Sequence, residues 1–370
     1  FHPTGMVWPP SVRGILVTEG VRGEGGILTN SEGKRFMFED VPPLYQSSTA
    51  DNEEEGWRYV TGDKEANRPP ELLTRDHVAR KIVKEVKEGR GSEHGGAYLD
   101  IAWIKEKIKD SEAHIKKKLP SMYHQFKELA GVDITKEKME VGPTTHYAMG
   151  GIRVDADTQM STVEGLFACG ECAAGLHGAN RLGGNSLSDL LVFGKRSGEY
   201  AAKFAEEYDS FGEIDSEEVN ALVTKALDSV DRTEGENPYK IQQELQETMQ
   251  DLAGIWRSEA GLNEAVERIR NYSERSRHTF APGNREYNPG WHTALDLHNL
   301  LIVSEALCLS AVQRTESRGG HYREEYPAKS EEGSTYNTVV RKGKDGSMEV
   351  ERTPVVPQTV EMKEIIEASQ

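Results

Sequence analysis

The sequence has few cysteines, no long apolar run and no basic excess, and each absence excludes a class of protein. Three cysteines in 370 residues do not form a disulfide framework, so a reducing compartment is the simpler interpretation. The densest apolar run, residues 300–303, is far shorter than the ~18 residues of a membrane span. The formal net charge of −17 argues against a nucleic-acid partner. We therefore expect a globular protein that reaches a membrane only through a partner.

The common catalytic fingerprints are missing as well. The sequence contains no GxGxxG, no Walker phosphate loop and no HExxH, so it lacks a complete nucleotide fingerprint and predicts no metal site. The pair Cys169 and Cys172 has the redox spacing CxxC, but a single pair is too short for a zinc site, and we interpret it as coincidence. The chain begins at Phe1 without an initiator methionine or a targeting segment, which leads us to expect a piece of a longer protein.

The most unusual stretch is GLHGANRLGGNSL, residues 175–187, where an arginine lies among four glycines. The residues before it, 165–171, predict a short buried strand that leads into a turn, and residues 187–193 open an amphipathic helix. A strand, a glycine-rich turn and a helix N-terminus bring backbone N–H groups close to a ligand. A mobile connector would not need Arg181 to be flanked by glycines, so we interpret the segment as a ligand site.

The remaining pattern predicts an α+β multidomain chain. Strands are expected at residues 14–20 and in a hairpin over residues 27–37, and residues 40–70 are polar enough for an exposed insertion. Thr74 should cap a helix with Val78 and Ile82 on its buried face. From Asp215 onward the apolar stripes predict a helical bundle core. The stripes are Val219, Leu222, Val223, Ala226, Leu227 and Val230; Ile241, Leu245, Met249 and Leu252; and a helix over 292–314. A hairpin around Lys344-Asp345-Gly346 is expected in the tail.

Basic and hydroxyl side chains recur in glycine-rich settings along the whole sequence. Taken singly, each has a structural explanation, because a lone histidine is more often part of the core. Together they describe a cationic pocket for a small dianion, with histidines and arginines to hold carboxylates. The set comprises His2 with Thr4, Thr18 with Glu19, Arg22, Arg75, His146 and Arg181.

Seven segments together resemble the flavoprotein subunits of succinate dehydrogenase and fumarate reductase, in the same order. They are FHPTG, LVTEGVRGEGG, RDHVAR, THYAMGG, GANRLGGNSL, LQETMQDLAGIWRSEAGL and RTESRGGHYREEYP. The resemblance covers Phe1 to about Pro327 and, more loosely, the tail. L-aspartate oxidase shares much of the pattern and is the nearest alternative. A non-catalytic binding module that lacks the flavin half is the alternative from another class.

The resemblance implies a role for each matching residue. His2, Thr18, His146 and Arg181 match the positions that grip the two carboxylates of succinate or fumarate. Arg75 matches the arginine that moves a proton to or from the substrate, and Glu19 and Arg22 match its relay partners. Matches to FAD contacts are Glu171, Ser186 and Leu187. A proton-transferring arginine is chemically demanding, because a guanidinium pKa exceeds 12. The first turn of a helix, where Arg75 is expected, disfavours a cation and eases this demand.

The resemblance also implies an architecture, a cofactor and partners. It divides the chain into a capping domain (1–145), a second, Rossmann-like α/β segment of the FAD-binding domain (146–205), a helical domain (206–328) and a C-terminal tail with a hairpin (329–370). The cofactor is FAD, and the partners are an iron–sulfur subunit, bound directly, with membrane anchor subunits reached indirectly. The implied location is cytoplasmic and peripheral, on the inner face of the cell membrane. Family members begin with a dinucleotide-binding half that this sequence does not contain, so we expect the chain alone to be inactive.

Overall fold

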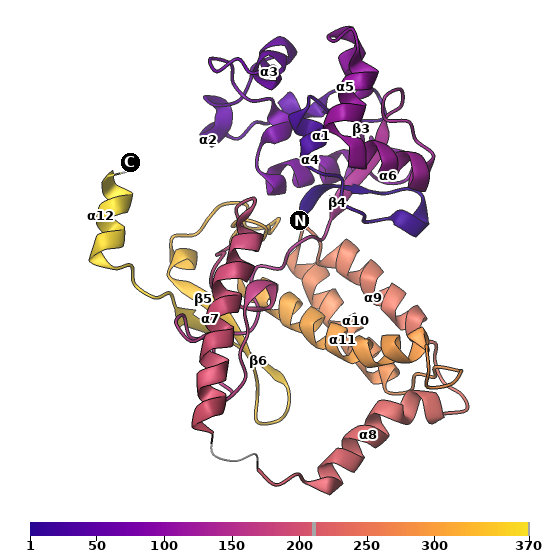
Figure 1. Ribbon diagram of the computed structural model, residues 1–370, viewed down its shortest axis with the longest axis vertical. Helices are drawn as coiled ribbons and strands as arrows, with labels where there is room; N and C mark the ends of the chain where they lie inside the picture. The colour runs from indigo at the N-terminus through magenta and orange to yellow at the C-terminus, as the bar shows by residue number, and fades with distance from the viewer. Residues whose placement is uncertain (209–211, 369–370) are drawn as a thin grey trace. The chain divides into compact units, whose positions relative to one another are not determined.

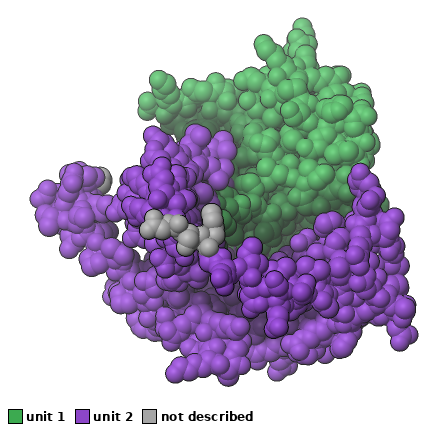
Figure 2. Space-filling view, turned by 60° about the horizontal axis from the view of Figure 1, so that its bottom comes forward, with its two compact units in different colours: residues 1–152, 171–176 green, residues 153–170, 177–370 purple. Residues whose placement is uncertain are grey.

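The computed structural model describes residues 1–208 and 212–368, and these form two compact units (Figures 1 and 2). Unit 1 comprises residues 1–152 and 171–176, and unit 2 comprises residues 153–170 and 177–370 apart from the residues not described. Both helices and strands occur, as the sequence predicts for an α+β chain.

Unit 1 is built on a four-stranded antiparallel sheet in the order β1-β4-β3-β2. Its strands are β1 (His2–Met6), β2 (Ile27–Thr29), β3 (Ala97–Asp100) and β4 (Met139–Thr144). The pairing between β1 and β4 shifts its register between His2 and Gly5. Helix α4 (Arg75–Lys87) packs on β1, β3 and β4, and Val78 and Ile82 on its inner face are fully buried. Helix α4 therefore forms one layer and the sheet that contains β1 forms the layer packed against it.

Shorter helices complete unit 1. They are α1 (Gly20–Gly23), α2 (Pro43–Gln46), α3 (Glu53–Val60), α5 (Ser111–Lys118) and α6 (Pro120–Ala130), with 3₁₀ turns at 10–12, 36–38, 70–72 and 102–106. The core beneath them includes Met6, Leu28, Phe36, Leu99, Ile104, Phe126 and Val141. Because α5 and α6 contribute Ile115, Met122 and Phe126 to it, their aromatic and aliphatic side chains extend this core.

Unit 2 is mostly helical. Its helices are α7 (Asn185–Glu207), α8 (Ser216–Asp231), α9 (Pro238–Leu252), α10 (Glu259–Ser276), α11 (Pro289–Gln313) and α12 (Val360–Ala368). Helices α9, α10 and α11 pack on one another around Ile241, Leu262, Ile269, Leu297 and Leu301. Side-chain caps fix where several helices begin: Asn237, Ser258 and Asn288 each accept a hydrogen bond from an amide of the following first turn.

The tail forms the expected hairpin. Strands β5 (Tyr336–Lys342) and β6 (Met348–Pro354) pair antiparallel over seven residue pairs around the Asp345-Gly346 turn. Among the residues that the structure describes, one helix, α11, is long and apolar enough to cross a membrane by length and composition alone. The densest apolar run in the sequence, residues 300–303, did not predict an apolar helix of this length. Leu297, Leu301, Cys308 and Ala311 of α11 are buried against its neighbours, whereas Leu300, Ile302 and Val303 are exposed.

Several local predictions are wrong. Residues 14–20 form no strand, since Leu16 makes a single bridge to Gly5 and the chain then enters α1. Residues 165–171 form no buried strand either: Ser161 and Leu166 close a tight turn, and one bridge joins Met160 to Phe167. Where a Rossmann-like α/β pattern was expected, the described residues of 146–205 form isolated bridges, a 3₁₀ turn at 170–172 and the helix α7. Without neighbouring strands to pair with, a strand at residues 165–171 would leave its backbone N–H and C=O groups unsatisfied.

Two further expectations are corrected by burial. Residues 40–70 are not a plain exposed insertion, because they contain α2 and α3 and end at Pro69 and Pro70, which are both buried. The apolar stripe of α8 is not core: Val219, Leu222 and Val223 are all exposed. The Thr74 side chain makes no capping hydrogen bond, although α4 begins where that cap was expected.

Candidate active site

His2 lies in the first strand of unit 1 and is almost completely buried, at 1% exposure. Its Nδ1 is 3.0 Å from the Thr4 carbonyl oxygen and 3.3 Å from the Thr4 amide nitrogen, so the ring can donate or accept there. Burial, followed by the positive charges of Arg22 and Arg75, lowers the pKa of His2 from 6.5 to about 3. The ring is therefore neutral at pH 7 and lies close to both arginines.

The second histidine of the predicted set is beside the first. The His146 ring meets the His2 ring edge-on, with 5.7 Å between their centroids. His146 follows β4, which pairs with β1, and this pairing brings two residues that are far apart in sequence to one sheet end. His146 is exposed whereas His2 is buried, so the pair runs from the interior to the surface of unit 1.

Three further residues of the predicted set form a charged cluster. The Glu19 carboxylate accepts a hydrogen bond from Arg75 Nε at 3.1 Å, and the same oxygen lies 3.8 Å from Arg22 Nη2. Arg75 is the first residue of α4, where the helix dipole disfavours a cation. Thr18 adjoins Glu19, and its hydroxyl accepts a hydrogen bond from the Gly20 amide at 3.4 Å. Unit 1 thus brings His2, His146 and the Thr18–Arg22 turn to the start of α4.

Arg22 is fully buried, which is rare for a guanidinium. It donates from Nη1 to the Glu71 carbonyl oxygen, whereas Nε and Nη2 are buried without a hydrogen-bond partner. Burial is the main reason why the pKa of Arg22 falls to about 10. Arg22 also lines a cavity of about 10 Å³, room for a single water molecule, together with Arg35 and Trp57.

Sequence reasoning missed the two residues that support Arg22. The buried Glu71 carboxylate is held by Arg35 through two hydrogen bonds, Nε to Oε1 at 2.7 Å and Nη2 to Oε2 at 2.8 Å. The negative charge of Glu71 raises the pKa of Arg22 and so opposes the effect of burial. Glu71 follows Pro69 and Pro70 at the end of a segment whose composition is that of an exposed insertion. The proline pair was the one available signal of an ordered turn.

The predicted residues of the glycine-rich loop are divided between the units. Arg181, Ser186 and Leu187 lie in unit 2, where Arg181 Nη1 donates to the Leu182 carbonyl oxygen at 3.2 Å. Glu171 belongs to unit 1, and its carboxylate accepts a hydrogen bond from the Ala148 amide at 2.9 Å. The pair Glu171 and Ala148 thus ties the segment after residue 170 to the loop that follows His146.

The start of α7 has the features that a flavin needs. Gly184 precedes the helix with φ +85°, and no side chain caps the first-turn amides. Beside these N–H donors, Leu187 is 69% exposed and Leu191 is 76% exposed. Amide donors with a positive dipole suit the polar edge of an isoalloxazine ring, and exposed leucines suit its apolar faces. The residues present therefore fit FAD.

Two parts of the chain match two family models. Residues 1–187 match the FAD binding domain family, and residues 242–366 match the family "Fumarate reductase flavoprotein C-term". A relative from Methanothermobacter marburgensis, one of the subunits of its fumarate reductase (CoM/CoB), is 41% identical over 332 residues, which are 88% of this chain and 53% of that protein. The succinate dehydrogenase flavoprotein subunit of Coxiella burnetii is 34% identical over 92% of this chain and 54% of that protein.

A solved structure gives the same result for the fold. "Mycobacterium smegmatis Sdh1 in complex with UQ1" superposes with a TM-score of 0.79 at 47% identity, covering 100% of this chain and 57% of that chain. The chain spans about half the length of the curated relatives it matches. The cofactor of these matching families is FAD. The chain belongs to the FAD binding domain family, and the relatives to which it is similar include flavoprotein subunits of succinate dehydrogenase and fumarate reductase.

Proposed function

We propose that this chain carries most of the dicarboxylate site of an FAD-dependent enzyme that interconverts succinate and fumarate. The observation that supports this most directly is the cluster around Glu19, whose carboxylate binds Arg75 at 3.1 Å beside the buried Arg22 and the neutral His2. A cluster of two arginines and two histidines, compensated by so few carboxylates, suits a small dianion.

In this proposal His2, Thr18, His146 and Arg181 hold the two carboxylates. Neutral His2 serves as a hydrogen-bond donor when the Thr4 amide donates to Nδ1, because the remaining proton is then on Nε2. Arg181 supplies a permanent positive charge with a planar pair of N–H donors. Gripping both ends of the diacid orients its central carbons.

The proton step is assigned to Arg75. FAD, when bound, supplies or accepts the hydride, and Glu171, Ser186 and Leu187 would contact it. Glu19 engages Arg75 at Nε, which leaves the two Nη groups for the proposed substrate carbon. Glu19 and Arg22 then return the proton toward solvent.

The wider assembly follows from the same family. The proposed direct partner is an iron–sulfur subunit, through which membrane anchor subunits would place the chain at the cytoplasmic face of the cell membrane. The proposed organisation is a capping domain over 1–145, a flavin segment over 146–205, a helical domain over 206–328 and a tail. The match of residues 242–366 to "Fumarate reductase flavoprotein C-term" favours this assignment over L-aspartate oxidase.

Two substitutions in the FAD-loaded holoenzyme test the proposal, with steady-state assays of succinate oxidation and fumarate reduction. Arg75→Ala should abolish turnover while dicarboxylate binding, measured by perturbation of the flavin spectrum, stays nearly unchanged. Arg181→Ala should weaken dicarboxylate binding severely. Arg58→Ala, at an exposed arginine that pairs with Asp63, is the control and should match wild type. Near-normal turnover of Arg75→Ala would remove its proton-transfer role.

A further inference from the structure

A tight hairpin in unit 2 touches the backbone of the loop that carries Arg181. The hairpin is closed by two hydrogen bonds between Arg318 and His321, and Gly319 and Gly320 form its tip. The Gly320 amide donates to the Ala179 carbonyl oxygen at 3.1 Å. Gly319 has φ +57°, and a Cβ built on it would lie 2.3 Å from the same oxygen. Only a glycine at position 319 therefore fits between the hairpin tip and Ala179.

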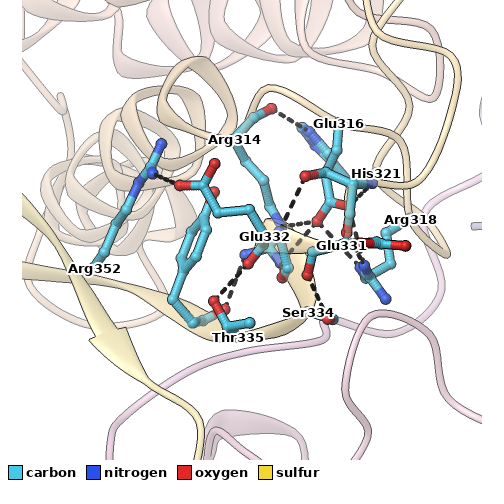
Figure 3. A network of polar contacts seen from close by, with 12 residues as sticks. Arg314, Glu316, Arg318, His321, Glu331, Glu332, Ser334, Thr335 and Arg352 are labelled. Atoms are coloured by element: carbon cyan, nitrogen blue, oxygen red, sulfur yellow. Dashed lines mark hydrogen bonds and ion pairs between the residues drawn. The ribbon is translucent and has the colours of Figure 1, made fainter.

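The base of this hairpin is held by a network of ion pairs centred on Glu316 (Figure 3). The Glu316 carboxylate is buried and accepts hydrogen bonds from Arg314 Nε at 2.9 Å, from Arg318 Nε and Nη2 at 3.1 Å each, and from the Ser330 amide at 2.8 Å. Gly333 packs directly against this carboxylate, and its carbonyl oxygen accepts from Arg314. A charge-assisted network of this kind fixes one geometry, because each carboxylate oxygen has its donors.

Buried cations anchor the hairpin to the helical bundle. His321 Nε2 lies 3.0 Å from the Arg314 carbonyl oxygen, and its Nδ1 lies 2.9 Å from Arg257 Nη1. Arg323, which is fully buried, donates from Nη1 to the carbonyl oxygens of Ala311 and Val312 at the end of α11. The hairpin tip is therefore the end of a rigid path that starts in the core of unit 2.

We propose that the Arg318–His321 hairpin is a positioning element for Arg181: it fixes the backbone at Ala179, two residues before the arginine, and so sets the direction of the guanidinium. The inference rests on the proposed role of Arg181 in holding a dicarboxylate. A loop with Gly175, Gly178, Gly183 and Gly184 has little rigidity of its own, so the accuracy of the arginine must come from a neighbour. The hairpin supplies this accuracy through the backbone at Ala179 and not through a contact with the substrate.

The main test is Gly319→Ala in the FAD-loaded holoenzyme. The added Cβ forces the tip away from Ala179, and we expect the KM for succinate and fumarate to rise about tenfold or more, because small displacements of a binding group have effects of this size. The shape of the kcat–pH profile should stay that of wild type, since the Arg75 cluster is unaltered. Gly346→Ala is the matched control: it has φ +85° but its Cβ would meet open space, so KM should not change.

A second variant decides the matter if Gly319→Ala does not fold. Arg318→Met removes two donors from Glu316 without adding atoms at Ala179. It should raise KM less than Gly319→Ala does. It should also speed hydrogen exchange in the peptide 175–184, a readout that needs no turnover. A fall in the amount of folded enzyme alone would lower the apparent kcat and leave KM unchanged.

The outcomes separate this inference from the proposed function. If Arg181→Ala leaves KM unchanged, the role of Arg181 is wrong and the positioning role falls with it. If Arg181→Ala raises KM but folded Gly319→Ala and Arg318→Met both keep the wild-type KM, only the hairpin's role is overturned. A raised KM in both hairpin variants, with Gly346→Ala normal, supports the assignment.

Discussion

Lowering the pH from 7 to 5 should destabilise unit 1 through two buried histidines. The fold lowers the pKa of His2 from 6.5 to about 3 and that of His77 from 6.5 to about 4, mainly through burial. In the unfolded chain both rings return to about 6.5. Below that pH the unfolded state binds protons that the folded state rejects, so the free energy of unfolding falls as the pH falls, until the folded pKa is reached.

The size of the effect follows from the shifts. Each pH unit below 6.5 costs about 1.4 kcal/mol per histidine, so at pH 5 each ring removes about 2 kcal/mol and the two together remove about 4 kcal/mol. That is a large part of the roughly 5–15 kcal/mol typical of a folded protein. The buried or paired carboxylates of unit 1, such as Glu85 and Glu140, have lowered pKa values and act in the same direction, but only below about pH 4.5.

Urea unfolding at pH 7, 6 and 5 measures this slope, with pulse hydrogen exchange of β1 and β4 peptides to report unit 1. His2→Gln should remove about half of the pH dependence, whatever it does to stability at pH 7. His124→Gln, at an exposed residue of α6, should keep the full dependence. If His2→Gln kept the wild-type slope, His2 would not be neutral in the folded state, and the electrostatic account of the site would be refuted.

Three other substitutions test the frame around the site. Glu71→Gln should lower the free energy of unfolding by about 3–5 kcal/mol in urea titrations, because it leaves the nearly buried Arg35 without its carboxylate. Gly151→Ala should lower the melting temperature of unit 1 more than Gly150→Ala, since both have positive φ but only the Cβ at 151 would lie 2.2 Å from a carbonyl oxygen; equal effects in calorimetry would contradict this. Arg323→Met should cost several kcal/mol in unit 2, because the α11 carbonyl oxygens lose their buried donor.

Helices were predictable wherever one face of the sequence pattern is both periodic and buried. Helix α4 begins at Arg75 and buries Val78 and Ile82, and α9 buries Ile241 and Leu245, as their spacing indicates. The hairpin of the tail follows from local turn chemistry at Asp345-Gly346. In each of these elements the signal is local, so a single sequence contains all of it.

The errors arise where burial depends on distant partners. The apolar stripe of α8 has the spacing of a core helix, yet Leu222 is exposed. The prediction failed because periodicity shows only that one face of a helix is apolar and does not show what covers that face. Residues 14–20 are apolar enough for a strand, and residues 14, 15 and 17 do make backbone hydrogen bonds to β1, but only Leu16 forms a bridge before the chain turns into α1. Helix α10 was missed altogether, since its core residues are interspersed with charges on a long exposed face.

For the site, sequence motifs named the residues, but only the tertiary structure shows which of them lie together. His2 and His146 meet because β1 and β4 pair, and Glu19 reaches Arg75 because α4 packs on the same sheet. Glu71 escaped notice because a carboxylate in a polar, proline-rich stretch usually faces solvent. The burial of Glu71 is explained by two arginines: Arg35 binds its carboxylate, and Arg22 donates to its carbonyl oxygen.

The charges of unit 1 are arranged against its own stability, and this links the fold to the proposed chemistry. The positive charges of Arg22 and Arg75 repel each other and keep His2 neutral, and the two carboxylates that oppose them, Glu19 and Glu71, are already bound to arginines. Neutralising either arginine would ease that repulsion, so the arrangement is costly for folding alone. In the proposed function a bound dianion would relieve it, because its carboxylates are attracted by both arginines. On that proposal, the repulsion between the two arginines would be returned as affinity for a dicarboxylate, and a singly charged acid would recover only part of it.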